Sequence, residues 1–114
     1  MSDCQFCKIV AGQTPATIVH RDDHITAFRD INPQAPTHIL IVPNQHIGGV
    51  THVTGEHGNT LAAMLTAATH LAESEGIATG GYRLVINEGP DAGQSVFHLH
   101  LHLLGGRQMT WPPG

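Results

Sequence analysis

The segment His98-Leu99-His100-Leu101-His102-Leu103-Leu104 constrains the fold more than any other part of this chain, because histidines and leucines alternate along it. Side chains in a β-strand point alternately to opposite faces, so the pattern predicts a strand whose leucines face the core. The three histidines then share the other face. We expect this strand to extend from Val96 to Leu104 and to end at Gly105-Gly106.

Four shorter runs of β-branched and aliphatic residues also predict strands, at residues 17–20, 25–28, 38–42 and 82–87. Asp22-Asp23 between the first two favours a hairpin. Pro33 and Pro36 predict an irregular turn before the third strand, which ends at Pro43. The segment from Glu88 to Ser95 is too rich in glycine and turn-forming residues to be regular.

Two helices complete the predicted set of elements. A short helix spans Cys4 to Ala11 and is closed by Gly12. A long helix spans Thr54 to Glu75, with Thr54 as N-cap and Gly76 as stop, and its apolar stripe comprises Leu61, Met64, Leu65, Ala68, Leu71 and Ala72. The order of elements predicts an α+β fold: a mainly antiparallel five-stranded sheet with one long helix and a short N-terminal helix. With 114 residues, the chain is expected to form one domain.

Charge and hydropathy exclude several classes of partner. The formal net charge is −4 and Lys plus Arg number only five, which argues against nucleic acid, because that partner needs a clustered basic surface. A single phosphate can still be held by backbone N–H groups and a few imidazoles. No apolar stretch approaches the roughly 18 to 20 residues that span a bilayer, so no membrane segment is expected. Met1-Ser2-Asp3-Cys4 lacks the features of a secretory signal, which predicts a cytoplasmic protein with reduced thiols.

The row of histidines has three interpretations. It can be the polar face of an amphipathic strand, although such faces are usually built from Thr, Lys, Glu or Ser. It can bind a catalytic metal ion, because imidazole is a common ligand. Alternate residues lie roughly 6.5 to 7 Å apart along a strand, which leaves the outer two histidines far apart for one ion. The third interpretation, with the middle imidazole as nucleophile toward phosphorus and its neighbours on the charged oxygens, explains the arrangement best.

Cys4-Gln5-Phe6-Cys7 also has three interpretations. A thioredoxin-like dithiol usually follows a strand, and none precedes this motif. Two buried cysteines without a chemical role are an ordinary alternative. The pair can also be half of a structural zinc site, completed by two imidazoles. The motif alone does not decide among these.

These segments resemble a known family. His98 to Leu104 fits the His-φ-His-φ-His-φ-φ signature of the histidine triad (HIT) superfamily without a departure. Further similarity to its Hint branch lies in residues 30–38 (Asp-Ile-Asn-Pro-Gln-Ala-Pro-Thr-His), 87–89 (Asn-Glu-Gly), 93–95 (Gly-Gln-Ser), 105–109 (Gly-Gly-Arg-Gln-Met) and 111–114 (Trp-Pro-Pro-Gly). The resemblance implies a single HIT domain, 1–114, with an extended tail, 105–114. It also implies cleavage of the P–N bond of AMP-type purine nucleoside phosphoramidates through a nucleotidyl-histidine intermediate.

The resemblance implies four catalytic residues. His100 would be the nucleophile, its other ring nitrogen held by an acceptor such as a backbone carbonyl. His102 would bind a phosphate oxygen, and His38 would back the site from a neighbouring strand. Ser95 would contact the phosphate or the leaving group.

Substrate binding would involve further residues by the same resemblance. Asp30 would accept both ribose hydroxyls, for which a carboxylate with two oxygens is suited. Gly93 and Gln94 would offer N–H donors from their loop, while Phe28 and Ile31 would line the base pocket. The full binding set is Phe28, Asp30, Ile31, Asn87 on the sugar–phosphate side, Gly93, Gln94, Ser95, His100, His102 and Trp111.

The resemblance also bears on metal and assembly. Some HIT proteins complete a zinc site at the N-terminal cysteines, and the corresponding ligands here are Cys4, Cys7, His46 and His98. Catalysis would need no cofactor, and the zinc would be structural. Hint-type proteins are homodimers, so Trp111 in the tail would reach the site of the other subunit. Alternative functions are a nucleotide-binding adaptor, a zinc-dependent hydrolase and a dinucleoside polyphosphate hydrolase.

Overall fold

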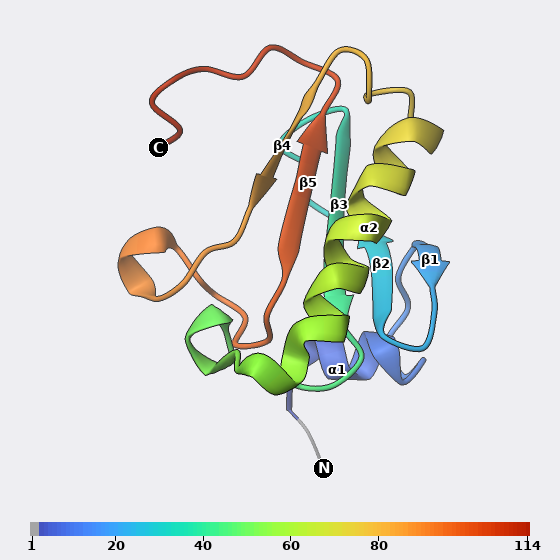
Figure 1. The fold of residues 1–114 in the computed structure, drawn as a ribbon, viewed down its shortest axis with the longest axis vertical. Coiled ribbons are helices and arrows are strands. Elements are labelled where there is room, and N and C mark those ends of the chain that lie inside the picture. Colours follow the sequence, from blue (N-terminus) through green and yellow to red (C-terminus); the bar gives the residue numbers. More distant parts are fainter. Residues whose placement is uncertain (1–2) are drawn as a thin grey trace.

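The computed structural model describes residues 3–114, and Met1 and Ser2, the start of the segment inspected for a signal, lie outside them. Five strands form one antiparallel sheet in the order β1-β2-β3-β5-β4. They are β1 (Ile18–Arg21), β2 (Ile25–Arg29), β3 (Thr37–Pro43), β4 (Tyr82–Val85) and β5 (Leu101–Gly105). The helices are α1 (Gln5–Val10) and α2 (Gly58–Ser74). The predicted fold class is confirmed, and β5 lies between β3 and β4 (Figure 1).

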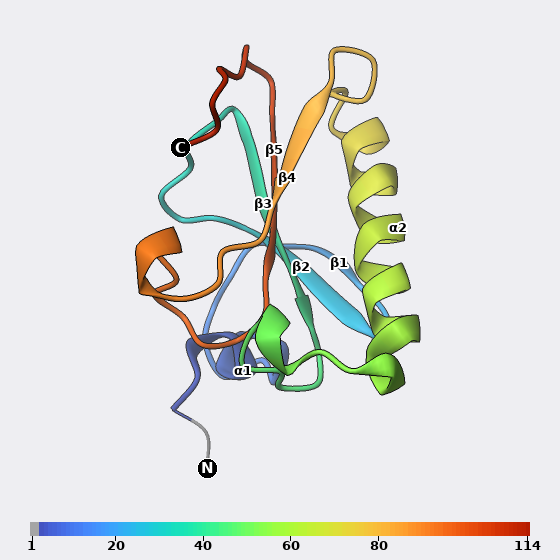
Figure 2. The ribbon, with the colours of Figure 1, turned by 60° about the vertical axis from the view of Figure 1, so that its left-hand side comes forward.

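The two faces of the sheet carry separate cores. One face packs against α2 through residues that include Ile39 and Ile41 of β3 and Leu101 and Leu103 of β5. The opposite face carries Phe28, Leu40 and Val42 and packs against Phe6 of α1. Figure 2 shows α2 on one side of the sheet, with α1 and the loop that follows β4 on the other. Because both faces of β3 are covered, all seven of its residues are buried.

The last strand is shorter than predicted. Leu99, Leu101 and Leu103 do face one core, as the alternation indicated. However, β5 begins at Leu101 and includes Gly105, whereas the prediction was Val96 to Leu104. Continued beyond Leu101, the antiparallel register would pair His100 with Val42 and then Leu99 with Pro43, which has no backbone N–H to donate. Instead, the Leu99 N–H donates to the Ile47 carbonyl at 2.6 Å.

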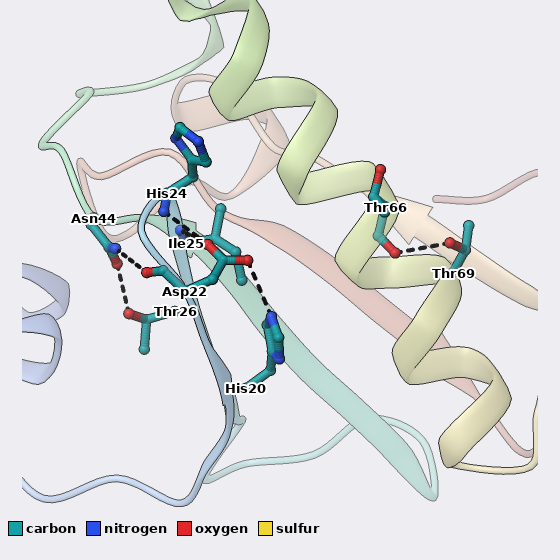
Figure 3. Close-up of polar contacts among 8 residues, drawn as sticks. All are labelled: His20, Asp22, His24, Ile25, Thr26, Asn44, Thr66 and Thr69. Carbon is teal, nitrogen blue, oxygen red and sulfur yellow. Dashed lines mark hydrogen bonds and ion pairs between the residues drawn. The ribbon is translucent and has the colours of Figure 1, made fainter.

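The turn between β1 and β2 is stabilised by the side chain of Asp22, whose contacts Figure 3 shows. Its Oδ1 accepts the backbone N–H groups of His24 and Ile25 at 2.8 and 2.9 Å, an arrangement that favours a turn. Asn44, just after β3, donates to the Asp22 carbonyl and accepts from the Thr26 hydroxyl. The turn is therefore attached to the end of β3.

The long helix starts later than predicted. Thr54 does cap a helical segment, but the first turn, Gly55–His57, is a 3₁₀ helix, and α2 follows it. Gly76 has φ of +76°, the left-handed conformation expected of a glycine that ends a helix. Leu65, which was assigned to the apolar stripe, is 52% exposed, because the buried stripe passes through Met64, Ala68 and Leu71 instead.

Two other regions complete the description. Strand β4 ends at Val85 rather than Asn87, and the glycine-rich loop after it contains a short 3₁₀ turn, Pro90–Ala92. No helix within residues 3–114 has the length and hydropathy to span a membrane.

Candidate functional site

The three histidines of the alternating segment have three different surroundings, because His98 and His102 belong to separate clusters and His100 belongs to neither. His98 lies before β5, is fully buried, and contacts Cys4, Cys7 and His46. His102 lies within β5 and contacts His38 of β3. His100 lies between them and lines the main pocket together with His102. The predicted start of the strand at Val96 is therefore wrong, since regular β-structure begins only after His100.

A backbone carbonyl fixes the tautomer of His100. Its Nδ1 lies 2.7 Å from the carbonyl oxygen of His98, so Nδ1 carries the proton and donates it to that oxygen. In the neutral ring, Nε2 then holds a lone pair. Phe6 of α1 packs edge-on against the same ring, with centroids 5.1 Å apart. The ring thus has a defined orientation and a nitrogen able to act as nucleophile.

A chain of hydrogen bonds fixes the tautomer of His102. The backbone N–H of Gln34 donates to Nδ1 of His38 at 3.0 Å, so in neutral His38 the proton resides on Nε2. That Nε2 lies 2.9 Å from Nδ1 of His102, which must accept. His102 therefore carries its own proton on Nε2. Within residues 3–114, this Nε2 is the one buried side-chain nitrogen or oxygen without a hydrogen-bond partner.

Burial keeps the His38 and His102 rings neutral. Burial first, and then the nearby His100 and His38 rings, lower the pKa of His102 to about 4, against a smaller opposing effect of Asp30. Burial likewise lowers the pKa of His38, opposed by the Asp30 carboxylate. Oδ2 of that carboxylate lies 3.4 Å from His38 Nε2. The site therefore presents a neutral hydrogen-bond donor at His102 next to the ring of His100.

A pocket of about 450 Å³ lies in front of these rings. Its volume falls within the roughly 300–1,000 Å³ of small-molecule sites. Six of the residues expected in the catalytic and binding sets line it: Phe28, Asp30, Ile31, Ser95, His100 and His102. Ile31 is 99% exposed, so a bound molecule would have a large apolar side chain to cover. The pocket thus unites β2, β5, the loop after β2 and the segment before β5.

Sequence reasoning missed the wall that α1 contributes. Gln5, Phe6, Lys8 and Ile9 of this helix line the pocket, as do Thr14, Pro15 and Ala16 of the segment that follows. The spacing of Phe6 and Ile9, three residues apart, does mark an apolar helix face. Nothing in that spacing indicates which part of the sheet the face covers.

Several residues of the expected catalytic and binding sets lie away from this pocket. His38 is buried behind His102, and Asn87 lies outside the pocket lining. The N–H groups of Gly93 and Gln94 donate to the carbonyls of Pro90 and Gly89 within their own loop. In this arrangement they do not offer themselves to a phosphate. The Gln94 side chain is buried, and it joins the loop by accepting from the Gly89 N–H and donating to Gly48 and Val96 carbonyls.

The tail behaves differently from the loop. Arg107 donates to the Gln34 carbonyl at 3.0 Å, and Arg83 of β4 donates to the Thr110 carbonyl at 3.0 Å. These bonds hold the tail against the domain. Trp111, just beyond them, is 82% exposed and contributes nothing to the pocket of its own chain.

Cys4, Cys7, His46 and His98 form a group whose ligand atoms all lie within 4.8 Å of one another. His98 donates Nε2–H to the Pro43 carbonyl at 2.8 Å, which leaves Nδ1 with the lone pair directed at the group. Two imidazole nitrogens on one tetrahedral zinc ion lie about 3.3 Å apart, given Zn–N distances near 2.0 Å. The Nδ1 atoms of His46 and His98 are 3.2 Å apart, and Cys7 Sγ is 3.2 and 3.5 Å from them. The donor set and spacing fit tetrahedral zinc.

A second group, Asp30, His38 and His102, also brings possible ligand atoms together. Its hydrogen bonds do not suit a metal ion. Nδ1 of His38 already accepts the Gln34 N–H, so Nε2 is the protonated nitrogen that would have to lose its proton to bind metal. No group of possible ligands within the described residues joins all three histidines of the alternating segment. This geometry disfavours a zinc hydrolase that uses the three as ligands.

Comparisons with known proteins identify the family of this chain. The HIT domain family matches residues 11–109. The chain is 54% identical over 104 residues to the purine nucleoside phosphoramidase of Escherichia coli (strain K12), covering 91% of this chain and 87% of that protein. It is 51% identical over 111 residues to the 14 kDa zinc-binding protein of Zea mays, covering 96% and 86%.

A solved structure gives the same result for the fold. The crystal structure of a HIT family hydrolase from Legionella pneumophila Philadelphia 1 has a TM-score of 0.96 and 55% sequence identity to this chain. The match covers 98% of this chain and 100% of that one. The chain therefore belongs to the HIT (histidine triad) family.

Proposed function

We propose that this protein cleaves the P–N bond of purine nucleoside phosphoramidates of the AMP type, in the cytoplasm, through a nucleotidyl-histidine intermediate. The observation that carries the proposal is the pairing of His100, held with its Nε2 lone pair available, with His102, whose Nε2–H has no protein partner. A nucleophile and an unused donor at one pocket suit attack on a phosphoryl group. The E. coli relative named purine nucleoside phosphoramidase supports the same reaction.

The proposed reaction has two steps. In the first, Nε2 of His100 bonds to phosphorus while the P–N bond breaks, and the departing nitrogen takes a proton from the Ser95 hydroxyl or from water. The ring becomes cationic, and the His98 carbonyl that accepts Nδ1–H stabilises it. In the second step, water attacks phosphorus, the P–Nε2 bond breaks, and a proton from the attacking water returns to the Ser95 oxygen, or to the hydroxide, that gave one up in the first step. The products are AMP, the free amine and neutral His100.

The remaining residues would bind the nucleotide. Asp30, at the pocket wall, would accept ribose hydroxyls through the carboxylate that already accepts the Asn32 N–H. Phe28 and Ile31 would cover the base, and Asn87 would approach the sugar–phosphate. Gly93 and Gln94 would contribute only if their loop rearranges on binding, because their N–H groups bond within it.

We further propose that Cys4, Cys7, His46 and His98 hold a structural zinc ion, with no cofactor taking part in catalysis. The zinc-binding relative from maize supports this assignment. We also propose a homodimer, because β4 is an edge strand and Phe97, in the segment just before β5, is 66% exposed. Trp111 would then reach the partner's pocket. Sedimentation that gives the mass of one chain would contradict the dimer.

The test is to incubate the protein with adenosine 5′-phosphoramidate and to follow AMP release. His100→Ala should lower turnover by several orders of magnitude, on the order of 10⁴-fold or more, while AMP still binds. His70→Ala, which removes an exposed histidine of α2, is the matched control and should behave as wild type. AMP binding without release by the wild-type protein would favour the adaptor function. Equal rates for His100→Ala and wild type would reject the covalent intermediate.

A further inference from the structure

His98 connects the metal group directly to the nucleophile. Its ring is held on both sides, by the Pro43 carbonyl at Nε2 and by the group with Cys4, Cys7 and His46 at Nδ1. Its backbone carbonyl accepts the Nδ1–H of His100 at 2.7 Å. Whatever fixes the His98 ring therefore also fixes the acceptor that sets the tautomer of His100.

Helix α1 makes a second connection between the same two places. Cys4 and Cys7 flank Phe6, whose ring is buried edge-on against His100 and His98, with centroids 5.1 and 6.0 Å away. A helix of six residues is too short to be stable alone, so its position depends on tertiary contacts. Two metal–sulfur bonds would hold both ends of the segment that carries Phe6.

We propose that the metal centre positions the nucleophile: an ion bound by Cys4, Cys7, His46 and His98 fixes the His98 carbonyl and Phe6, and both fix His100. This inference rests on the proposed function, because it treats His100 as the nucleophile. His98 is then a positioning residue that acts through its main chain. In the metal-free protein the four ligand atoms lose the ion that they share, and the His98 ring keeps its bond to the Pro43 carbonyl but loses the restraint that the ion would supply at Nδ1. His100 then populates both neutral tautomers, and the nucleophilic one is only part of the population.

The first experiment removes the metal from the full-length protein reversibly. Histidine labelled with ¹⁵N allows long-range ¹H–¹⁵N spectra to report the protonated nitrogen of His100 directly, independently of turnover. With zinc bound, we expect one tautomer, with the proton on Nδ1. After chelation, the two nitrogen shifts should move toward each other and turnover should fall roughly 10- to 100-fold, the usual range for groups that orient an active residue. Adding zinc back should restore both.

A pair of variants separates positioning from loss of stability. Cys7→Ala should lose the metal and show the mixed tautomer of His100. Leu71→Ala, which shortens a buried side chain of α2 on the other face of the sheet, lowers stability without touching the metal group. It should keep the single tautomer and bind zinc. If Leu71→Ala shows the same mixture, or if chelated wild type keeps one tautomer, the proposal is wrong.

The spectra test the positioning proposal and the assay tests the proposed reaction, so each can be rejected without the other. A protein that binds no zinc, or whose His100 tautomer ignores zinc, overturns the positioning proposal even if it cleaves phosphoramidates. A protein whose tautomer follows zinc but that releases no AMP supports the positioning and rejects the proposed reaction.

Discussion

Two clusters that contain histidines meet the chain a few residues apart, one at His98 just before β5 and the other at His102 within β5. Their hydrogen-bonding patterns are opposite. In the cluster of Cys4, Cys7, His46 and His98, sulfur atoms and a nitrogen lone pair converge on one point. In the cluster of Asp30, His38 and His102, donors and acceptors alternate. The first suits a cation, and the second suits an anion at its free end.

The backbone group behind each ring accounts for the difference. A carbonyl, from Pro43, accepts from the back nitrogen of His98 and leaves a lone pair at the front. An N–H, from Gln34, donates to the back nitrogen of His38 and leaves a proton at the front. His100 follows the first pattern, with the His98 carbonyl behind it. The main chain therefore decides which nitrogen of each imidazole carries the proton and which carries the lone pair.

The largest effect should come from breaking the first cluster at its buried member. His98→Ala removes a fully buried ring and leaves the Pro43 carbonyl without its donor. We expect loss of bound zinc and a decrease of roughly 3–5 kcal/mol in the free energy of unfolding. Denaturant unfolding and metal analysis measure the two effects. Unchanged zinc content would show that the ligands lie elsewhere.

Acid should destabilise the folded protein through the second cluster, because His102 resists protonation in the folded state. His102 has a pKa of about 4 in the folded protein, below the ordinary 6.5, so the unfolded chain binds the proton first as pH falls. The contribution of this ring to the free energy of unfolding is fully present above pH 6.5. It is lost as pH falls to 4, a loss of at most about 3 kcal/mol. His102→Gln should show a shallower decline over this range in unfolding experiments. Parallel curves for the two proteins would remove His102 as the source.

Breaking the chain of donors without removing a ring should affect turnover more than metal content. His38→Phe keeps a ring of similar size but leaves the Gln34 N–H and His102 Nδ1 without partners. We expect a loss of roughly 1–3 kcal/mol in transition-state stabilisation, seen in kcat/KM for AMP release. Zinc content should equal that of wild type. A variant that loses zinc as well would show that the two clusters are not separate.

The smallest effect concerns the carboxylate at the end of the second cluster. Asp30→Asn should weaken AMP more than 2′-deoxy-AMP, by about 1 kcal/mol, because an amide accepts from only one of its two ends. Calorimetric titration with the two nucleotides gives the difference. Equal weakening of both would assign Asp30 to supporting His38 rather than to the ribose.

Much of the fold followed from local pattern. The leucines before and within β5, the aliphatic run of β3 and the glycine after α2 all have the positions that periodicity and turn chemistry predicted. The start of β5 was not predictable in this way, since it depends on Pro43 in a different strand. Leu65 was wrongly assigned to the buried stripe because spacings of three and four fit two neighbouring rows of residues on the helix. Only the row with Met64 packs against the sheet.

The site was less predictable than the fold. The pattern itself indicated histidine chemistry, and the family resemblance supplied the ligand set that the structure brings together. The wall from α1 was missed because a six-residue helix carries no mark of its tertiary partner. The donor chain was missed for a similar reason: the Gln34 N–H is a main-chain group, and its encounter with His38 depends on the turn between them. The roles of the individual residues stay predictions.

The place of β5 between β3 and β4 also sets the order in which the molecule matures during synthesis. It is the last strand in sequence among the described residues, yet it occupies an interior position in the sheet. Before it emerges from the ribosome, β3 and β4 have no common neighbour, and Cys4 lies 94 positions ahead of its ligand partner His98. Contacts of such separation close late in folding. Assembly of the group of Cys4, Cys7, His46 and His98 and of the surroundings of His100 therefore belongs to one final event, which requires β5.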